Sequence, residues 1–264
     1  MKKITATVNL KHTLDKGQIF RYWSEENGYR IIHGKNAFFV EKRGKSILFD
    51  GIGKAELKSF FRLDDDYEKI IKTINKDSII ANARGKYPGL RILRQDPWEC
   101  TISFLCSSAT NIPRIKRDLN SIAQTFGEEK DGFFLFPKIG EIDGEKKLRE
   151  CGTGFRAKYI AEVNDTVTPP FFKHLKTKPY EEAKARLMEL PGIGPKVADC
   201  ILLFSCNHLN AFPIDTWGEK ILKEDYRQHP KANYTKLSAF AQSYFSPYAG
   251  YAQQFLYHWK RMEK

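Results

Sequence analysis

The chain changes its periodicity near residue 54, and this change constrains the fold more than any other feature. Before it, apolar and polar residues alternate in short stretches, over residues 18–23, 29–33, 37–43 and 46–49, which turn residues separate. Short connections between strands indicate an antiparallel meander. After it, apolar residues recur at helical spacing. A small sheet followed by many helices is an α+β arrangement.

Helical spacing begins around Leu57 and Ile70 and continues to the C-terminus. The positions of the apolar residues divide this part of the chain into separate segments. They predict helices over residues 98–126, 145–151, 155–163, 180–189, 195–206, 216–224, 232–244 and 248–262.

The 264 residues are 41% hydrophobic, enough for one large domain or for a few small ones that share a core. No run of about 18 apolar residues occurs, so we expect no transmembrane helix and no membrane partner. The alternation from Ile4 to Val8 indicates a strand and not the apolar core of a signal peptide. We therefore expect an intracellular protein.

The formal net charge is +12, from 44 basic and 32 acidic residues. Such an excess attracts polyanions and raises the rate of encounter with nucleic acid. Charge alone leaves nucleic-acid binding about as plausible as a Lys-rich surface without a special function.

The five cysteines are odd in number and scattered, which argues against a disulfide framework. None of their spacings is that of a zinc site, so we predict no metal ligands among them. They are expected to be small buried residues, with Cys200 as an exception that also serves the functional site.

A short glycine-containing segment, from Leu190 to Lys196, lies between two apolar helix faces. Gly192 and Gly194 allow a tight turn and a close approach of the backbone to a ligand. Free amide groups at the start of the second helix favour an anion. The segment predicts a helix-hairpin-helix that binds a DNA phosphate without reading sequence. An ordinary turn between two helices is the alternative.

Lys196 follows Pro195 at the start of the second helix. The positive end of a helix disfavours a protonated amine and favours the neutral form that acts as a nucleophile. Asp215 comes after that helix has ended, where its carboxylate can stabilise positive charge on a deoxyribose. The alternatives are a phosphate-contacting lysine and a helix-capping aspartate.

These features resemble the helix-hairpin-helix Gly-Pro-Asp superfamily of DNA glycosylases, in which a lysine at position 196 marks bifunctional members. The resemblance narrows to 8-oxoguanine DNA glycosylase of the eukaryotic-like type and extends over nearly the whole chain. The segments that carry it are Gly17-Gln18-Ile19-Phe20-Arg21-Tyr22, Arg94-Gln95-Asp96-Pro97-Trp98-Glu99-Cys100, Ser103-Phe104-Leu105-Cys106-Ser107-Ser108, Gly154-Phe155-Arg156-Ala157-Lys158-Tyr159 and Tyr248-Ala249-Gly250-Tyr251-Ala252-Gln253.

The resemblance implies an N-terminal antiparallel sheet domain like that of the TATA-binding protein, over residues 1–97. Two helical subdomains would follow, with the lesion pocket between them. One comprises residues 98–115 and 195–264, and the other comprises residues 116–194 and ends in the helix-hairpin-helix.

The resemblance also implies a monomeric base excision repair enzyme whose partner is double-stranded DNA containing 8-oxoguanine. The damaged base would be flipped out of the duplex. Lys196 would attack the anomeric carbon, Asp215 would stabilise the cationic sugar, and the Schiff base would allow β-elimination. The chain would therefore be a DNA glycosylase with AP lyase activity.

The lesion base would be held by residues from several parts of the chain. The carbonyl of Gly17 would accept the N7–H that 8-oxoguanine has and guanine lacks. Cys200 and Tyr257 would lie on its two faces, Gln253 would contact its pairing edge, and Pro213 would complete the pocket.

Other residues would contact the DNA. Phe155 would enter the duplex as a wedge, and Arg114 would contact the cytosine that loses its partner. The remaining positions expected to face DNA are Gly192, Gly194, Val197, Asn111, Arg156 and Trp217.

We expect no cofactor. A structural cation bound by the carbonyl groups of Met188, Leu190 and Ile193 at the hairpin is the one ion that the resemblance suggests.

The chain departs from the family's pattern in three places. A run of asparagines is replaced by Ala109-Thr110-Asn111, a histidine by Trp217, and the usual phenylalanine by Tyr257. These changes bear on selectivity for the opposite base and not on the reaction. The rival functions are an alkylbase glycosylase, which needs no nucleophilic lysine, and a non-catalytic DNA-binding module, which needs neither Lys196 nor Asp215.

Overall fold

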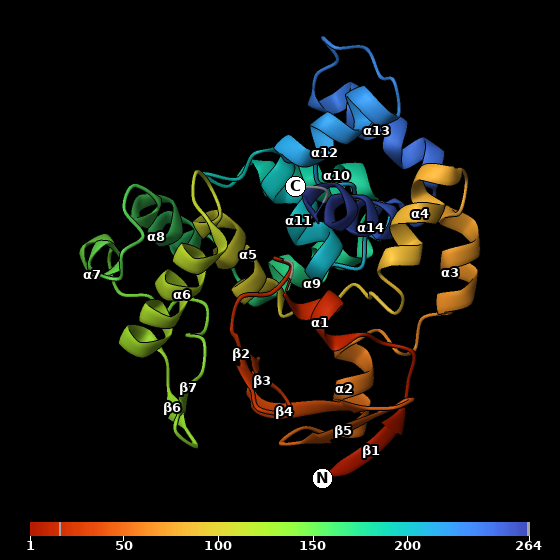
Figure 1. Ribbon diagram of the computed structural model, residues 1–264. Coiled ribbons are helices and arrows are strands. Elements are labelled where there is room, and N and C mark those ends of the chain that lie inside the picture. Colours follow the sequence, from red (N-terminus) through yellow and green to blue (C-terminus); the bar gives the residue numbers. More distant parts are fainter. Residues whose placement is uncertain (16, 263–264) are drawn as a thin grey trace.

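A computed structural model describes residues 1–15 and 17–262 and has the expected α+β architecture (Figure 1). An antiparallel sheet with the order β1-β5-β4-β3-β2 forms the N-terminal part, and helices form the rest. The last four strands make the predicted meander, and β1 pairs with β5. The strands are β1 Lys2–Thr5, β2 Tyr22–Glu25, β3 Gly28–His33, β4 Asn36–Arg43 and β5 Ser46–Asp50.

The strand predicted over residues 18–23 is wrong in position, because β2 begins only at Tyr22. Gln18 is fully buried, and its amide group donates to the carbonyl oxygens of Thr13 and Arg91 at 2.7 and 2.9 Å. Its side-chain oxygen accepts the Leu93 amide at 2.8 Å. These bonds tie the segment before β2 to the interior of the molecule, outside the sheet.

One face of the sheet is covered by helix α2, Lys54–Phe60, and by the short helix α1, Leu10–Leu14 (Figure 1). The helix α1 was not predicted. Alternate strand residues such as Phe38, Val40 and Phe49 are buried in the core that these elements share. Burial of one face of a strand follows from the alternation of side chains across a sheet.

The helices that follow are packed around a second, larger core. Helices α3 and α4 precede residue 97, yet they contact the C-terminal helix α14. The domain boundary proposed at residue 97 therefore stays a prediction. The helices are α3 Tyr67–Ile74, α4 Ser78–Lys86, α5 Pro97–Cys106, α6 Ile112–Phe126, α7 Glu145–Glu150, α8 Arg156–Thr166, α9 Pro169–Thr177, α10 Tyr180–Met188, α11 Pro195–Ser205, α12 Thr216–Lys220, the π-helix η1 Ile221–Asp225, α13 Tyr234–Phe245 and α14 Ala249–Met262, with two short strands, β6 Glu129–Lys130 and β7 Phe133–Phe134, after α6.

The helix predicted over residues 98–126 is in fact two helices, α5 and α6. Between them Ala109 has a φ of 49°, a left-handed conformation that a helix does not continue through. Asn111 then caps α6, since its side-chain oxygen accepts the Arg114 amide at 3.0 Å. The predicted helix over residues 216–224 likewise divides into α12 and η1, and α9 was not predicted.

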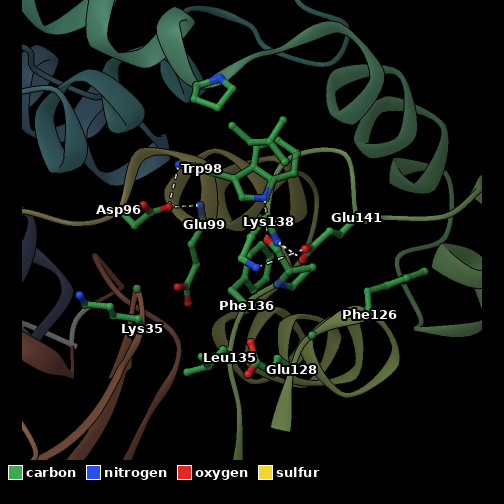
Figure 2. A pocket seen from close by; sticks show the side chains of 15 residues that line it. Lys35, Asp96, Trp98, Glu99, Phe126, Glu128, Leu135, Phe136, Lys138 and Glu141 are labelled. Carbon is green, nitrogen blue, oxygen red and sulfur yellow. Dashed lines mark hydrogen bonds and ion pairs between the residues drawn. The ribbon is translucent and has the colours of Figure 1, made fainter. Parts of the chain in front are cut away.

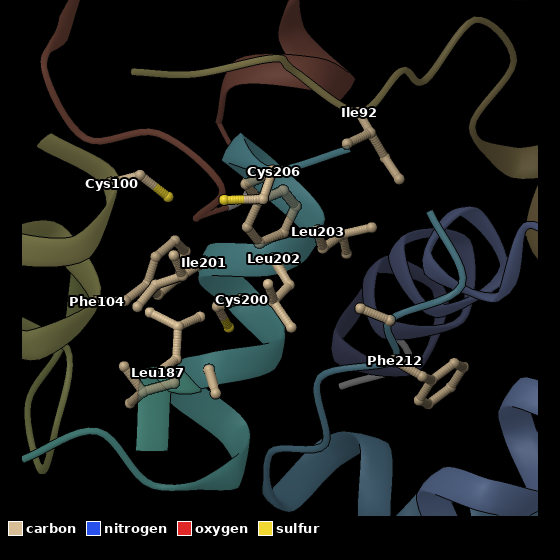
Figure 3. Close-up of a cluster of buried hydrophobic side chains, with 14 of the residues drawn as sticks. Ile92, Cys100, Phe104, Leu187, Cys200, Ile201, Leu202, Leu203, Cys206 and Phe212 are labelled. Atoms are coloured by element: carbon tan, nitrogen blue, oxygen red, sulfur yellow. The ribbon is translucent and has the colours of Figure 1, made fainter. Parts of the chain in front are cut away.

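Helix α11 occupies the centre of the larger core (Figure 3). Every residue from Val197 to Ser205 is buried, and the helix packs against α5 and α10. A helix that is buried all round holds its side chains in fixed positions. It is the element that carries Lys196 and Cys200.

No helix among residues 1–15 and 17–262 is long and apolar enough to cross a membrane.

Candidate active site

Two adjoining cavities lie beside the start of α11. The outer one has a volume of about 560 Å³ and the inner one about 80 Å³. The two cavities share five lining residues, which are Gly17, Phe104, Lys196, Asp215 and Tyr257. The catalytic pair predicted from the sequence therefore lies at the junction of the two cavities.

Lys196 is the second residue of α11, directly after Pro195. Its Nζ donates to the Ser107 hydroxyl at 3.4 Å and lies 5.6 Å from the centre of the Phe104 ring. Both partners come from α5 or its C-cap, so the packing of α11 against α5 positions the amine. Among the residues that the structure describes, no carboxylate lies within 4.0 Å of this amine.

Asp215 is the N-cap of α12, and its Oδ1 accepts the Gly218 amide at 2.8 Å. The alternative that the sequence left open, a capping aspartate, is therefore present. The same side chain lines both cavities, so capping and a role in the site coexist. Capping fixes the carboxylate, which is what an electrostatic role in catalysis requires.

The residues predicted to hold the base all line the inner cavity: Gly17, Cys200, Pro213, Gln253 and Tyr257. Burial raises the pKa of the Cys200 thiol to about 12, so this sulfur is protonated at neutral pH. Gln253 is buried, and its side-chain oxygen accepts from the Gln254 amide at 2.7 Å. Gly17 has a φ of 86°, a conformation that favours glycine.

Of the positions at the hairpin that were predicted to face DNA, Val197 borders the outer cavity, whereas Gly192 and Gly194 line neither cavity. Gly192 has a φ of 77°, and a Cβ there would lie 2.7 Å from the Tyr159 ring. Position 192 therefore requires glycine on two grounds. Gly194 caps α11, and a Cβ on it would meet open space.

The expected cation at the hairpin stays a prediction. The Leu190 carbonyl accepts the Ile193 amide at 3.3 Å, and this carbonyl keeps a second lone pair. Within residues 1–15 and 17–262, no cluster of side chains has the composition of a metal site.

The predicted DNA contacts are spread more widely. Asn111 and Trp217 border the outer cavity, whereas Arg114, Phe155 and Arg156 do not. Phe155 is 54% exposed, as an apolar wedge must be before it meets the duplex. Whether it enters DNA stays a prediction.

The two predicted arginines are engaged inside the protein. Arg114 donates to the buried carboxylate of Asp118 at 3.1 Å. Arg156 is buried and donates to the carbonyl oxygens of Ser108 and Ala109. Arg156 therefore holds the segment that joins α5 and α6, which places Ala109 at the outer cavity.

Sequence reasoning missed three features of the site. Ser107 belongs to one of the motifs that carry the family resemblance, and its hydroxyl accepts a hydrogen bond from Lys196. Arg261 borders the outer cavity. Asp199 is fully buried beside the site and accepts from Tyr180 and Tyr234 at 2.5 Å and from Lys184 at 2.9 Å. The available signal was the position of Asp199, an acidic residue three places after Lys196 in a segment made mostly of apolar residues.

A third cavity of about 730 Å³ is larger but lies elsewhere (Figure 2). It lies between the β3–β4 turn, the start of α5 and the segment after α6, and it includes Glu99 and Trp98. Trp98 donates to the Pro137 carbonyl at 2.9 Å. None of the described residues that line it was predicted for the site.

Comparison with known proteins identifies the family of the chain. A family model described as 8-oxoguanine DNA glycosylase, N-terminal domain, matches residues 1–101. The chain is 37% identical to an N-glycosylase/DNA lyase of Saccharomyces cerevisiae over 265 residues, which cover 86% of this chain and 70% of the relative. It is 39% identical to an N-glycosylase/DNA lyase of Arabidopsis thaliana over 189 residues, with 64% of this chain and 51% of the relative covered.

A solved structure gives the same assignment over the whole fold. The 8-oxoguanine glycosylase/lyase of Clostridium acetobutylicum, in complex with double-stranded DNA containing cytosine opposite 8-oxoguanine, is 32% identical. The superposition has a TM-score of 0.92 and covers 98% of this chain and 93% of that one. From its sequence identity and its fold, the chain belongs to the 8-oxoguanine DNA glycosylase family of N-glycosylase/DNA lyases.

Proposed function

We propose that this protein excises 8-oxoguanine from duplex DNA and then cleaves the strand at the resulting site. The observation that carries the proposal is that Lys196 and Asp215 line the same two cavities. A thiolate at Cys200 would be a competing nucleophile in the inner cavity, but burial raises the pKa of Cys200 to about 12 and keeps it a thiol. The lysine amine is then the group suited to form a covalent bond with the sugar.

The reaction begins when the glycosidic bond between C1′ and the base breaks and the base leaves with the electron pair. Asp215 stabilises the positive charge that develops on the sugar. The Lys196 nitrogen forms a bond to C1′ and loses a proton, while the departed base takes up a proton. The C1′–O4′ bond then breaks, O4′ takes up a proton from water, and the opened sugar is a Schiff base. Loss of a proton from C2′ then expels the 3′ phosphate, which breaks the strand.

Recognition of the lesion is assigned to the backbone of Gly17. Its carbonyl group would accept the N7–H of 8-oxoguanine, whereas guanine would place an acceptor against an acceptor and leave a buried polar group unpaired. Cys200 and Tyr257 would enclose the base, and Gln253 would contact its pairing edge. We further propose that the protein acts inside the cell, where its DNA substrate is. We propose that it acts as a monomer.

Borohydride trapping of a covalent complex with a duplex containing 8-oxoguanine tests this function. Wild-type protein should be trapped, whereas Lys196→Gln should neither excise the base nor be trapped and should still bind the duplex. Lys231→Gln is the matched control, since it removes an exposed lysine that lines neither cavity. Excision by Lys196→Gln at near the wild-type rate would show that the lysine is not the nucleophile.

A further inference from the structure

The mouth of the outer cavity carries a cation that the proposed reaction does not use. Arg261 is exposed in the last turn of α14, one turn after Tyr257. Tyr257 lines both cavities, whereas Arg261 lines the outer one only. Arg261 therefore lies at the entrance to the site, outside the space that the base would occupy.

The guanidinium group of Arg261 is fixed by one neutral partner. Its Nη1 donates to the Tyr257 hydroxyl at 2.8 Å, and its central carbon lies 5.8 Å from the centre of the Tyr257 ring. Throughout residues 1–15 and 17–262, no carboxylate lies within 4.0 Å of the Arg261 guanidinium. A guanidinium has five N–H donors, so most of them remain for a ligand.

The other arginines considered for DNA binding differ in this respect. Arg114 is paired with Asp118 at 3.1 Å, and Arg156 is buried against backbone carbonyl groups. Arg261 is the one of these three whose charge faces the cavity without a carboxylate beside it. At the same cavity Trp217 contributes an indole, which carries no charge.

We infer that Arg261 binds a phosphate of the DNA strand next to the extruded nucleotide, and that the Tyr257 hydroxyl positions its guanidinium for this contact. The inference rests on the proposed function. A phosphate is favoured over the base because Arg261 does not line the inner cavity. The planar, permanently charged guanidinium suits the two oxygens of a phosphate group.

The test measures the dissociation constant for a duplex that contains tetrahydrofuran, an abasic-site analogue that the enzyme cannot cleave, at several salt concentrations. Arg261→Gln should weaken binding about 10-fold. The slope of log K against log salt should become shallower by about 0.9, the value for one lost phosphate contact. Lys231→Gln, which removes an equal charge away from the cavities, should leave both quantities unchanged.

Two further variants separate charge from positioning. Arg261→Lys keeps the charge and should restore the salt slope, while affinity stays below that of the wild type. Tyr257→Phe keeps the ring and the Arg261 charge but loses the hydroxyl, so it should weaken binding about threefold with an unchanged salt slope.

The outcomes distinguish this inference from the proposed function. An unchanged salt slope in Arg261→Gln, or an equal change in Lys231→Gln, overturns the phosphate contact. An Arg261→Gln protein that binds normally but excises 8-oxoguanine more slowly at saturating enzyme overturns it as well, since the residue then acts on the base or the sugar. Failure of the wild type to excise 8-oxoguanine rejects the proposed function alone, because the tetrahydrofuran duplex reports the contact without any reaction.

Discussion

The hydroxyl of Tyr234 joins Asp199 to the segment that carries Asp215. It donates to the Asp199 carboxylate at 2.5 Å and accepts the backbone amide of Ile214 at 3.3 Å. Asp199 belongs to α11, as does Lys196. Through one phenol, the helix that carries Lys196, the proposed nucleophile, is therefore connected to the residue next to Asp215, the proposed catalytic carboxylate.

Tyr234→Phe should slow single-turnover excision several-fold, because the Ile214 amide loses its acceptor and Asp215 is less firmly placed. It should also lower the free energy of unfolding by about 1–2 kcal/mol through the lost hydrogen bonds. Tyr180→Phe is the matched control, since Tyr180 donates to the same carboxylate at 2.5 Å from α10. Equal losses of rate in the two variants would reduce the role of Tyr234 to stability.

Asp215→Asn should slow base removal by a factor on the order of a hundred or more, with a smaller loss of DNA binding. Asparagine caps a helix about as well as aspartate, so the α12 N-cap is retained and the negative charge is what changes. The measurement is single-turnover excision together with a thermal melt. A rate like that of the wild type in a normally folded variant contradicts the electrostatic role.

Ala109→Asn should sharpen the preference for cytosine opposite the lesion, because alanine has no polar atom with which to contact the orphan base. The φ of 49° at this position also suits asparagine better than alanine, so the free energy of unfolding should rise by about 0.5–1 kcal/mol.

Ala109→Gly relieves the same backbone strain without adding a polar group and is the control for this prediction. Excision is measured opposite each of the four bases. A strict cytosine requirement in the wild type, or equal sharpening by Ala109→Gly, is the result that counts against a polar contact from position 109.

Stability should fall as pH rises through neutrality because of Glu99. Burial is the main cause that raises the pKa of this carboxyl to about 7. The Arg21 cation lowers the pKa, and the neighbouring Asp96 raises it further. A folded-state pKa above the unfolded value means that the stabilisation is complete below about pH 4.5 and is lost as pH rises through about 7.

The loss due to Glu99 is on the order of 2–3 kcal/mol between pH 5 and pH 8. Urea unfolding of the wild type and of Glu99→Gln at both pH values measures it, since the variant lacks the titrating group. Parallel pH dependences in the two proteins would show that Glu99 does not titrate in this range.

The sequence predicted that Lys196, Asp215 and the base-pocket residues lie in one site, because these residues occupy fixed positions in recognisable motifs. The break between α5 and α6 was missed, although Asn111 and Pro113 give the local signal of a helix start. Arg156, which comes much later in the chain, holds the carbonyl groups of Ser108 and Ala109 in the break. A contact over that sequence separation leaves no local pattern.

The same limit explains Arg261 and Ser107. An arginine near the end of an amphipathic helix is an ordinary surface residue in a sequence, and only the packing of α14 brings it to the cavity. The strand misplaced at 18–23 has a similar cause, since Gln18 bonds with residues near position 91. Local alternation of apolar residues cannot report such a partner.

The protonated state of Cys200 bears on the resistance of the enzyme to oxidation. Oxidants attack thiolates far more readily than thiols. Burial raises the pKa of Cys100, Cys106 and Cys206 as well as that of Cys200. A protein that works on oxidised DNA meets the oxidants that damaged it, and here these four sulfur atoms are kept as thiols, their less reactive form. The inner cavity thus presents a polarisable sulfur atom to a base, and the same sulfur is protected from oxidation because it stays a thiol.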